Sequence, residues 1–260
     1  MMRARVITTI GATTIGAIGF ALGLIIAWQV LADARLISPI FFPAPSRALS
    51  VLAARVADGS LFAPLAATVL RMIVGWLLAC LAGIALGAAI ASSRIARDLL
   101  EPTLEFLRPL PASSVIPVAI LFLGLSNAMS LAVIAFGAIW PVLLASIHGF
   151  TAVPPELHDV ADVLGFSRSK YLKSIALPAA APDIMAGVRV SLAIALILAV
   201  VTEMQASLAG LGWEIFYAQR VYRSADLYAG LIVLGIVGFA ANYLLQCLER
   251  QALPWRSINP

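Results

Sequence analysis

Apolar residues are concentrated in six runs along the chain, and shorter polar or basic stretches separate these runs. A helix that crosses the hydrocarbon core of a bilayer needs about 20 apolar residues. Five runs approach or exceed that length, whereas the third is shorter and contains Pro111 and Pro117. The predicted spans are residues 7–31, 65–91, 110–125, 128–147, 184–201 and 227–248. The pattern predicts an all-α integral membrane protein with about six transmembrane helices.

The composition supports a membrane location. Of the 260 residues, 62% are hydrophobic and 12% are charged, and the mean hydropathy is +1.01. Soluble domains carry about 25% charged residues, so these charges are too few to cover a water-exposed surface. The net charge of +4 does not predict a nucleic-acid partner, because basic residues of membrane proteins gather in cytoplasmic loops. Cys80 and Cys247 lie inside apolar runs and are interpreted as small buried hydrophobic residues.

The distribution of basic residues predicts the orientation. The first run follows a short basic stretch, as in a signal peptide, but it is too long, lacks a cleavage site and ends at Asp33 and Arg35, so it is predicted to be retained. If both termini are cytoplasmic, eleven of the 17 basic residues lie inside and five lie outside. The positive-inside rule favours that orientation. Arg71 remains within a span near its outer face, where it is expected to reach the headgroups.

An extracytoplasmic segment, residues 33–64, joins the first two spans. Ser46 is expected to cap a short amphipathic helix that continues to Asp58. Its apolar face is predicted to contain Leu49, Leu52, Ala53 and Val56. This helix is expected to lie on the outer membrane surface or against neighbouring helices.

The longest cytoplasmic loop joins the fourth and fifth spans and is predicted to form two short helices around a glycine. Pro155 and Glu156 suit a helix start. Gly165 supplies a left-handed residue at the helix end, Ser167 can cap the second helix, and Leu177-Pro178 is expected to end it.

The first of these two helices has an apolar stripe. Its members follow i, i+3, i+4, i+7 spacing and are Leu157, Val160, Ala161 and Leu164. Such a stripe must be buried against something. Two interpretations satisfy the pattern. The stripe contacts a cytoplasmic partner protein, or it packs on the chain's own helix ends or on the membrane surface.

The same loop resembles the signature of binding-protein-dependent ABC permeases. That signature reads Glu-Ala-Ala, three residues, Gly, nine residues, then Ile-x-Leu-Pro. Here Asp159-Val160-Ala161 takes the first place, Gly165 the second, and Ile175, Leu177 and Pro178 the last. Asp replaces Glu and Val replaces the first Ala, while the glycine and the downstream spacing agree.

The resemblance extends over residues 67–255, and its closest likeness is to the subgroup that imports sulfonates, nitrate, bicarbonate or thiamine-precursor pyrimidines. The supporting stretches are residues 68–71, 107–111, 123–125, 136–141, 201–204 and 210–212. The resemblance implies a type I ABC importer permease fold with a cytoplasmic coupling helix. It divides the chain into a transmembrane helix with a periplasmic amphipathic segment (1–63), the permease domain (64–250) and a cytoplasmic tail (251–260).

The resemblance also implies partners. The permease is expected to form a homodimer in the lipid of the bacterial inner membrane, where a periplasmic binding protein delivers the solute. A cytoplasmic ATPase dimer is expected to bind ATP and Mg, and the permease itself to hold no cofactor. The residues expected to contact the ATPase are Leu157, Asp159, Val160, Ala161, Leu164, Gly165, Ile175, Leu177 and Pro178.

Few residues are candidates for the solute pathway. One is Pro117, whose break in the helix suits either a pathway or packing. The others are Asn127, which is equally interpreted as part of the polar turn between the third and fourth spans, and Glu203 at the outer end of the fifth span. Glu203 is interpreted either as a pathway residue or as a paired or hydrated carboxylate at the interface. The chain contains neither a Gly-x-x-x-x-Gly-Lys-Ser/Thr loop for ATP nor a His-Glu-x-x-His metal motif. The scarcity of intramembrane acids argues against an ion-coupled transporter or an intramembrane enzyme.

Overall fold

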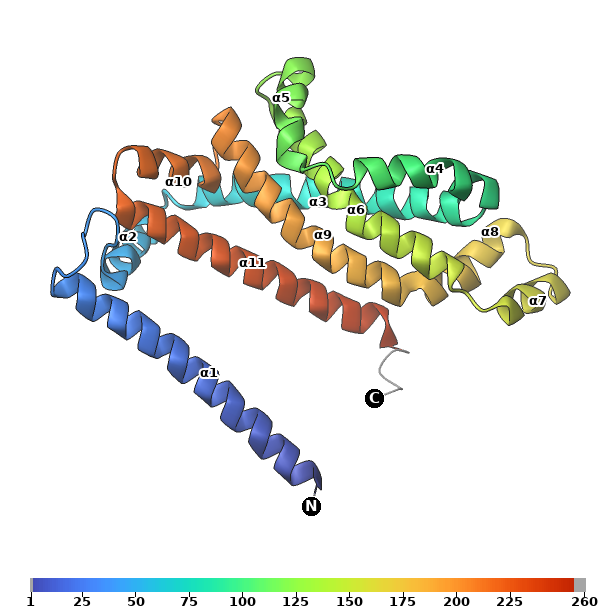
Figure 1. Cartoon of the computed structure of the whole chain (residues 1–260), viewed down its shortest axis with the longest axis horizontal. Coiled ribbons are helices and arrows are strands. Elements are labelled where there is room, and N and C mark those ends of the chain that lie inside the picture. Colours follow the sequence, from blue (N-terminus) through green and yellow to red (C-terminus); the bar gives the residue numbers. More distant parts are fainter. Residues whose placement is uncertain (1, 255–260) are drawn as a thin grey trace. The chain divides into compact units, whose positions relative to one another are not determined.

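A computed structural model describes the backbone of residues 2–254, and the side chains of this range apart from residues 2–15, 18, 94 and 101. The predicted inside residues Arg3, Arg5 and Arg94 therefore have no described side chain, and residues 255–260 of the predicted tail lie outside the described range. The described chain is built from helices without strands, which confirms the all-α fold (Figure 1).

The helices follow one another with short connections. They are α1 (Met2–Asp33), α2 (Pro45–Ala57), α3 (Phe62–Ala91), α4 (Arg94–Leu107), α5 (Ala112–Leu123), α6 (Asn127–Thr151), α7 (Pro155–Val163), α8 (Arg168–Tyr171), a π-helical turn (Leu172–Ala176), α9 (Leu177–Ala206), α10 (Leu211–Arg220) and α11 (Ser224–Ala252). Each of the six predicted spans falls on one of these helices.

Four helical stretches are long and apolar enough to cross a membrane within the described residues: α3, α6, the continuous run Arg168–Ala206 and α11. The third predicted span is only the 12-residue α5, and α4, which the hydrophobic pattern did not predict, precedes it at a bend of 94°. Counting this bent pair as one span gives five. The apolar part of α1 with described side chains is Gly19–Asp33.

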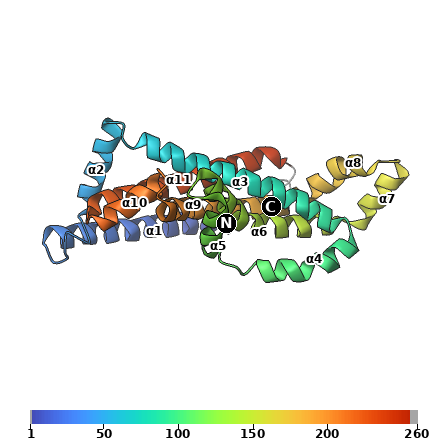
Figure 2. The ribbon, with the colours of Figure 1, turned by 90° about the horizontal axis from the view of Figure 1, so that it is seen from above.

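The chain forms two compact units. One contains the residues up to 62 together with 214–233, and the other contains 63–213 together with the residues from 234 onward. Within the larger unit, α7 and α8 lie beyond the ends of α6 and α9 in both views (Figures 1 and 2).

The core of the larger unit depends on close contact between α3, α6 and α9. A Cβ atom on Gly75 would lie 2.5 Å from a methyl group of Ile134, and one on Gly83 would lie 3.0 Å from Val142. Gly87 is similarly tight against α6. Gly83 and Gly87, four residues apart, thus let α6 approach α3, whereas Gly19 and Gly23 have the same spacing in α1 and a Cβ atom on either would meet nothing within 4 Å. Helices in lipid associate through close packing, and small residues permit this because they let the two backbones approach each other.

The smaller unit corrects the prediction for α2. Pro45 occupies the first turn and Ser46 is not the cap; instead, the Ser46 amide donates to the Gln29 side chain of α1 at 3.0 Å. The buried face of α2 centres on Ala48 rather than on the predicted apolar face, of which Leu49 is an exposed member. Arg55 lies on the Ala48 face, because it is paired with Glu214. The inward face of α2 therefore carries an ion pair, which an apolar pattern does not predict.

Candidate functional site

The cytoplasmic loop predicted from the sequence folds as two helices joined at Gly165. Pro155 begins α7 with Glu156 in its first turn. At the other end, the Phe166 amide donates to the Ala161 carbonyl at 2.9 Å, and the Gly165 amide donates to the Asp162 carbonyl at 3.0 Å. Gly165 has φ of 61°. This is the hydrogen-bond pattern of a Schellman motif, which requires a left-handed residue, and it confirms the predicted conformation of Gly165.

The second helix of the loop differs from the prediction at its end. Ser167 caps it as expected, because its hydroxyl accepts from the Lys170 amide at 3.3 Å. Leu177 and Pro178 do not end it: α8 passes through the π-helical turn into α9, which begins at Leu177. Pro178 lies in the first turn of α9, directly after the π-helical turn, and has no amide proton to donate back into that turn.

Side chains hold the two loop helices together. The Tyr171 hydroxyl lies 2.6 Å from His158 Nε2, and the two ring centroids are 4.8 Å apart. Lys170 Nζ lies 4.0 Å from the centre of the Phe166 ring. His158 is exposed on α7 and is the partner of Tyr171 on α8. A separation of 13 residues gives no periodic signal from which this pair could be predicted.

The predicted apolar stripe of α7 divides into two faces. Ala161 is 3% exposed and Leu157 is half-buried, so both face the chain itself. Val160 and Leu164 are 47% and 60% exposed, and Val163, which the stripe did not include, is 87% exposed. We call Val160, Val163 and Leu164 the outer face of α7. Of the other predicted contact residues, Asp159 and Leu177 are exposed and Ile175 and Pro178 are half-buried.

A second polar site lies inside the larger unit, around Glu203. The side chain of Glu203 has no exposed surface. Its carboxylate accepts hydrogen bonds from Arg71 Nη1 at 2.7 Å, from the Thr68 hydroxyl at 2.9 Å and from the Gly212 amide at 2.8 Å. Arg71 also donates to Asn127 Oδ1 at 2.8 Å. We call these residues the Glu203 cluster.

The cluster corrects the expectation for Arg71. Its side chain is only 11% exposed and does not extend toward headgroups, because it donates to Glu203, Asn127 and the Ala209 carbonyl. A buried carboxylate is costly without partners, and near the end of α9 Glu203 finds them on α3 and at the start of α10. This contact joins residues more than 130 positions apart, so no local pattern predicts it.

The glycines of the Gly210-Leu211-Gly212 stretch are explained by the same cluster. A Cβ atom on Gly210 would overlap the Glu203 carboxylate, and one on Gly212 would lie 2.5 Å from the Val200 carbonyl oxygen. The backbone can therefore approach the carboxylate only without side chains at these two positions. Among the predicted pathway residues, Asn127 and Glu203 are joined through Arg71, whereas Pro117 lies on an exposed part of α5.

Comparison with known proteins identifies the family. The model of the family described as "Binding-protein-dependent transport system inner membrane component" matches residues 79–255. The chain belongs to this family. It is therefore a multi-pass membrane permease and not itself an enzyme, and the matched region contains α6, the whole α7–α8 loop and α9.

Relatives of this permease carry names that point to small solutes. SsuC of Bacillus subtilis, named for aliphatic sulfonate transport, is 32% identical over 234 residues, covering 90% of this chain and 85% of that protein. The nitrate import permease NrtB of Leptolyngbya laminosa is 30% identical over 197 residues, covering 76% of this chain and 71% of that protein.

A solved structure shares the fold. The inward-facing MetNI methionine ABC transporter contains a chain that matches the permease with a TM-score of 0.64 and 17% sequence identity. The match covers 74% of this chain and 95% of that chain. The permease thus has the type I ABC importer fold that the sequence predicted.

Proposed function

We propose that the permease forms, as a homodimer, the pathway of an ABC importer for a small oxyanion-bearing solute such as a sulfonate or nitrate. A periplasmic binding protein delivers the solute, and a separate ATPase dimer binds ATP with Mg. The names of SsuC and NrtB support the solute class, and the family description supports dependence on a binding protein. The missing phosphate-binding loop supports ATP hydrolysis on another chain.

The observation that carries this proposal is the outer face of α7. Three apolar side chains project from a nine-residue helix at the far end of the larger unit. An amphipathic helix with such anchors is typical of docking into a hydrophobic groove of a partner protein. Ala161 is buried against the chain and the His158–Tyr171 contact joins α7 to α8, so they hold the helix in position while Val160, Val163 and Leu164 make the contact.

The connection of α7 to the membrane suits a coupling role. Beyond the Gly165 turn, α8, the π-helical turn and α9 form one helical run from Arg168 to Ala206. A displacement of α7 by the ATPase would therefore reach the membrane-spanning part of α9 without a flexible linker. Closure of the ATPase pair around ATP would move the docked helices and open the pathway outward, and hydrolysis would reset it.

Charge on the outer face of α7 tests the docking. We expect Val163→Asp to leave membrane insertion intact and to abolish co-purification of the ATPase, because an aspartate would be desolvated in an apolar contact. Ser169→Asp places the same charge in the same loop but on exposed α8, and is expected to retain the ATPase. Normal ATPase retention and normal solute uptake by Val163→Asp would refute docking through α7.

Uptake tests the solute class. A strain that lacks the permease gene is expected to lose uptake of labelled taurine, an alkanesulfonate or nitrate, and to regain it with the wild-type gene. Competition among these three anions would rank them. Unchanged uptake of all three in the deletion strain, together with lost uptake of a cationic or neutral solute, would refute the oxyanion assignment while leaving the docking result untouched.

A further inference from the structure

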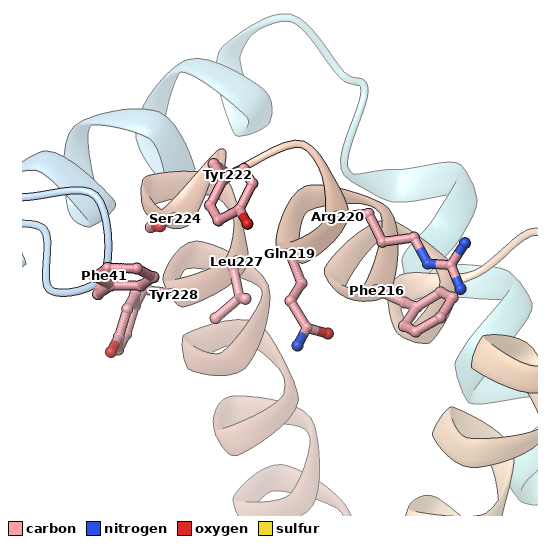
Figure 3. Close-up of a pocket in the computed structure, with 8 residues that line it drawn as sticks. All are labelled: Phe41, Phe216, Gln219, Arg220, Tyr222, Ser224, Leu227 and Tyr228. Atoms are coloured by element: carbon pink, nitrogen blue, oxygen red, sulfur yellow. The ribbon is translucent and has the colours of Figure 1, made fainter.

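Two adjacent cavities lie in the smaller unit, where the ends of α10 and α1 meet the first turn of α11. The more polar one has a volume of about 410 Å³. Figure 3 shows Arg220 and Phe216 at one end of it, Phe41 and Tyr228 at the other, and Gln219 between them. The Arg220 guanidinium carbon lies 4.5 Å from the centre of the Phe216 ring. The structure gives Arg220 no carboxylate partner among the side chains it describes.

The second cavity is a groove of about 500 Å³ with an almost entirely apolar lining. Leu24, Trp28 and Leu31 place it along about two turns of α1, and Phe42 and Tyr228 complete it. Tyr228 also lines the polar cavity, and the consecutive residues Phe41 and Phe42 line one cavity each. The two cavities therefore adjoin each other at Tyr228 and at Phe41-Phe42. A single elongated ligand that passes beside these residues could occupy both.

The lining of the groove contains an unpaired hydrogen-bond donor next to Tyr228. Trp28 packs against Tyr228 with ring centroids 5.2 Å apart. Its indole nitrogen is buried and finds no acceptor in the described part of the chain. Buried indole N–H groups normally have a partner, so this unpaired donor in the groove lining is available to an acceptor on a bound ligand.

We propose that the two cavities together bind one glycerophospholipid molecule. The phosphate would lie at Arg220 and Gln219, an ester carbonyl would accept from the Trp28 indole, and an acyl chain would lie in the groove along α1. This order of an anion, a hydrogen-bond acceptor and a long apolar chain matches the order of groups in the site. A small water-soluble oxyanion would leave the groove empty. The adjoining part of α1, Gly19–Asp33, is apolar, so lipid surrounds the open side of the groove.

Fluorescence of the purified full-length permease tests this site. A phosphatidylglycerol brominated on its acyl chains quenches nearby tryptophans, and the difference between wild type and Trp28→Phe isolates the signal of Trp28. We expect saturable quenching of Trp28 in detergent micelles. Arg220→Gln should raise the half-saturating lipid concentration by about tenfold, the cost expected for one lost charge-assisted hydrogen bond.

Matched controls separate the site from general lipid contact. Arg47→Gln removes an exposed arginine of α2 that lines neither cavity and should leave the half-saturating concentration unchanged. Brominated diacylglycerol, which has no phosphate, should bind wild type and Arg220→Gln equally. Native mass spectrometry should also detect fewer retained phospholipids on Arg220→Gln than on wild type, a readout that does not need the Trp28 variant.

Two results would overturn the proposal. One is quenching of Trp28 that rises linearly with lipid and never saturates, as for any residue in contact with bulk lipid. The other is equal phosphatidylglycerol affinity and equal lipid retention in wild type and Arg220→Gln, which would leave the guanidinium without a role in holding phosphate.

Discussion

Loss of Arg71 and loss of Glu203 should lower the free energy of unfolding by different amounts, although the two residues form one ion pair. Arg71→Met would leave a carboxylate with no exposed surface and only the Thr68 and Gly212 donors. Removal of one partner of a buried pair costs about 3–5 kcal/mol, because the remaining charge is uncompensated. We expect a loss of this size in the free energy of unfolding, which is a large share of the stability of an ordinary domain.

Glu203→Gln should cost less. The amide keeps an oxygen that can accept from Thr68 or Gly212, and Arg71 keeps its hydrogen bonds to Asn127 and the Ala209 carbonyl. Arg71 is also 11% exposed, so water compensates part of its charge. The expected cost is about 1–3 kcal/mol, the range for one unsatisfied buried group. The double variant Arg71→Met/Glu203→Gln should be more stable than Arg71→Met alone, since no uncompensated charge remains.

The assay is reversible unfolding in mixed detergent micelles, followed by circular dichroism, for wild type, both single variants and the double variant. Arg223→Met is the matched control, because Arg223 is 63% exposed and pairs with Asp226, which is 20% exposed and lies three residues further along the chain. Partly exposed pairs contribute about 0–1 kcal/mol. If the two single effects at Arg71 and Glu203 simply add within about 0.5 kcal/mol, or if Arg223→Met costs as much as Arg71→Met, the reasoning is refuted.

Further predictions concern coupling and topology. Gly165→Val should lower stability by only about 1–2 kcal/mol, the cost of a left-handed residue with a side chain, yet abolish solute uptake; retained uptake would contradict the role of the turn. Tyr171→Phe removes the contact with His158 and should weaken ATPase binding without affecting insertion, measured by co-purification. An impermeant thiol reagent should label Ser50→Cys on intact cells and Ser169→Cys only after permeabilisation, and the reverse would invert the orientation. The purified permease alone should hydrolyse no ATP; vanadate-sensitive turnover by it would refute a separate ATPase.

Local signals predicted the α7–α8 loop well. The Gly165 turn, the Pro155 start and the Ser167 cap each depend on a few neighbouring residues, so their chemistry is readable from the chain. The spacing of apolar residues predicted less, because it indicates that one face of a helix is buried but not which surface covers that face. Ala161 faces the chain and Val163 faces outward, although both lie on the same short helix.

The amino-acid sequence by itself determined the membrane location, the positions of the apolar helices and the family signature, because each follows from composition or from spacing within about 20 residues. Only the tertiary structure decided the partners of the charged groups. Arg71 was expected to reach the headgroups and instead donates to Glu203. Arg55 of α2 pairs with Glu214. A charged side chain in an apolar interior must find a polar partner, because an unpaired buried charge is costly. In this chain those partners lie more than 100 residues away in the sequence, and only the packing of the helices brings them into contact.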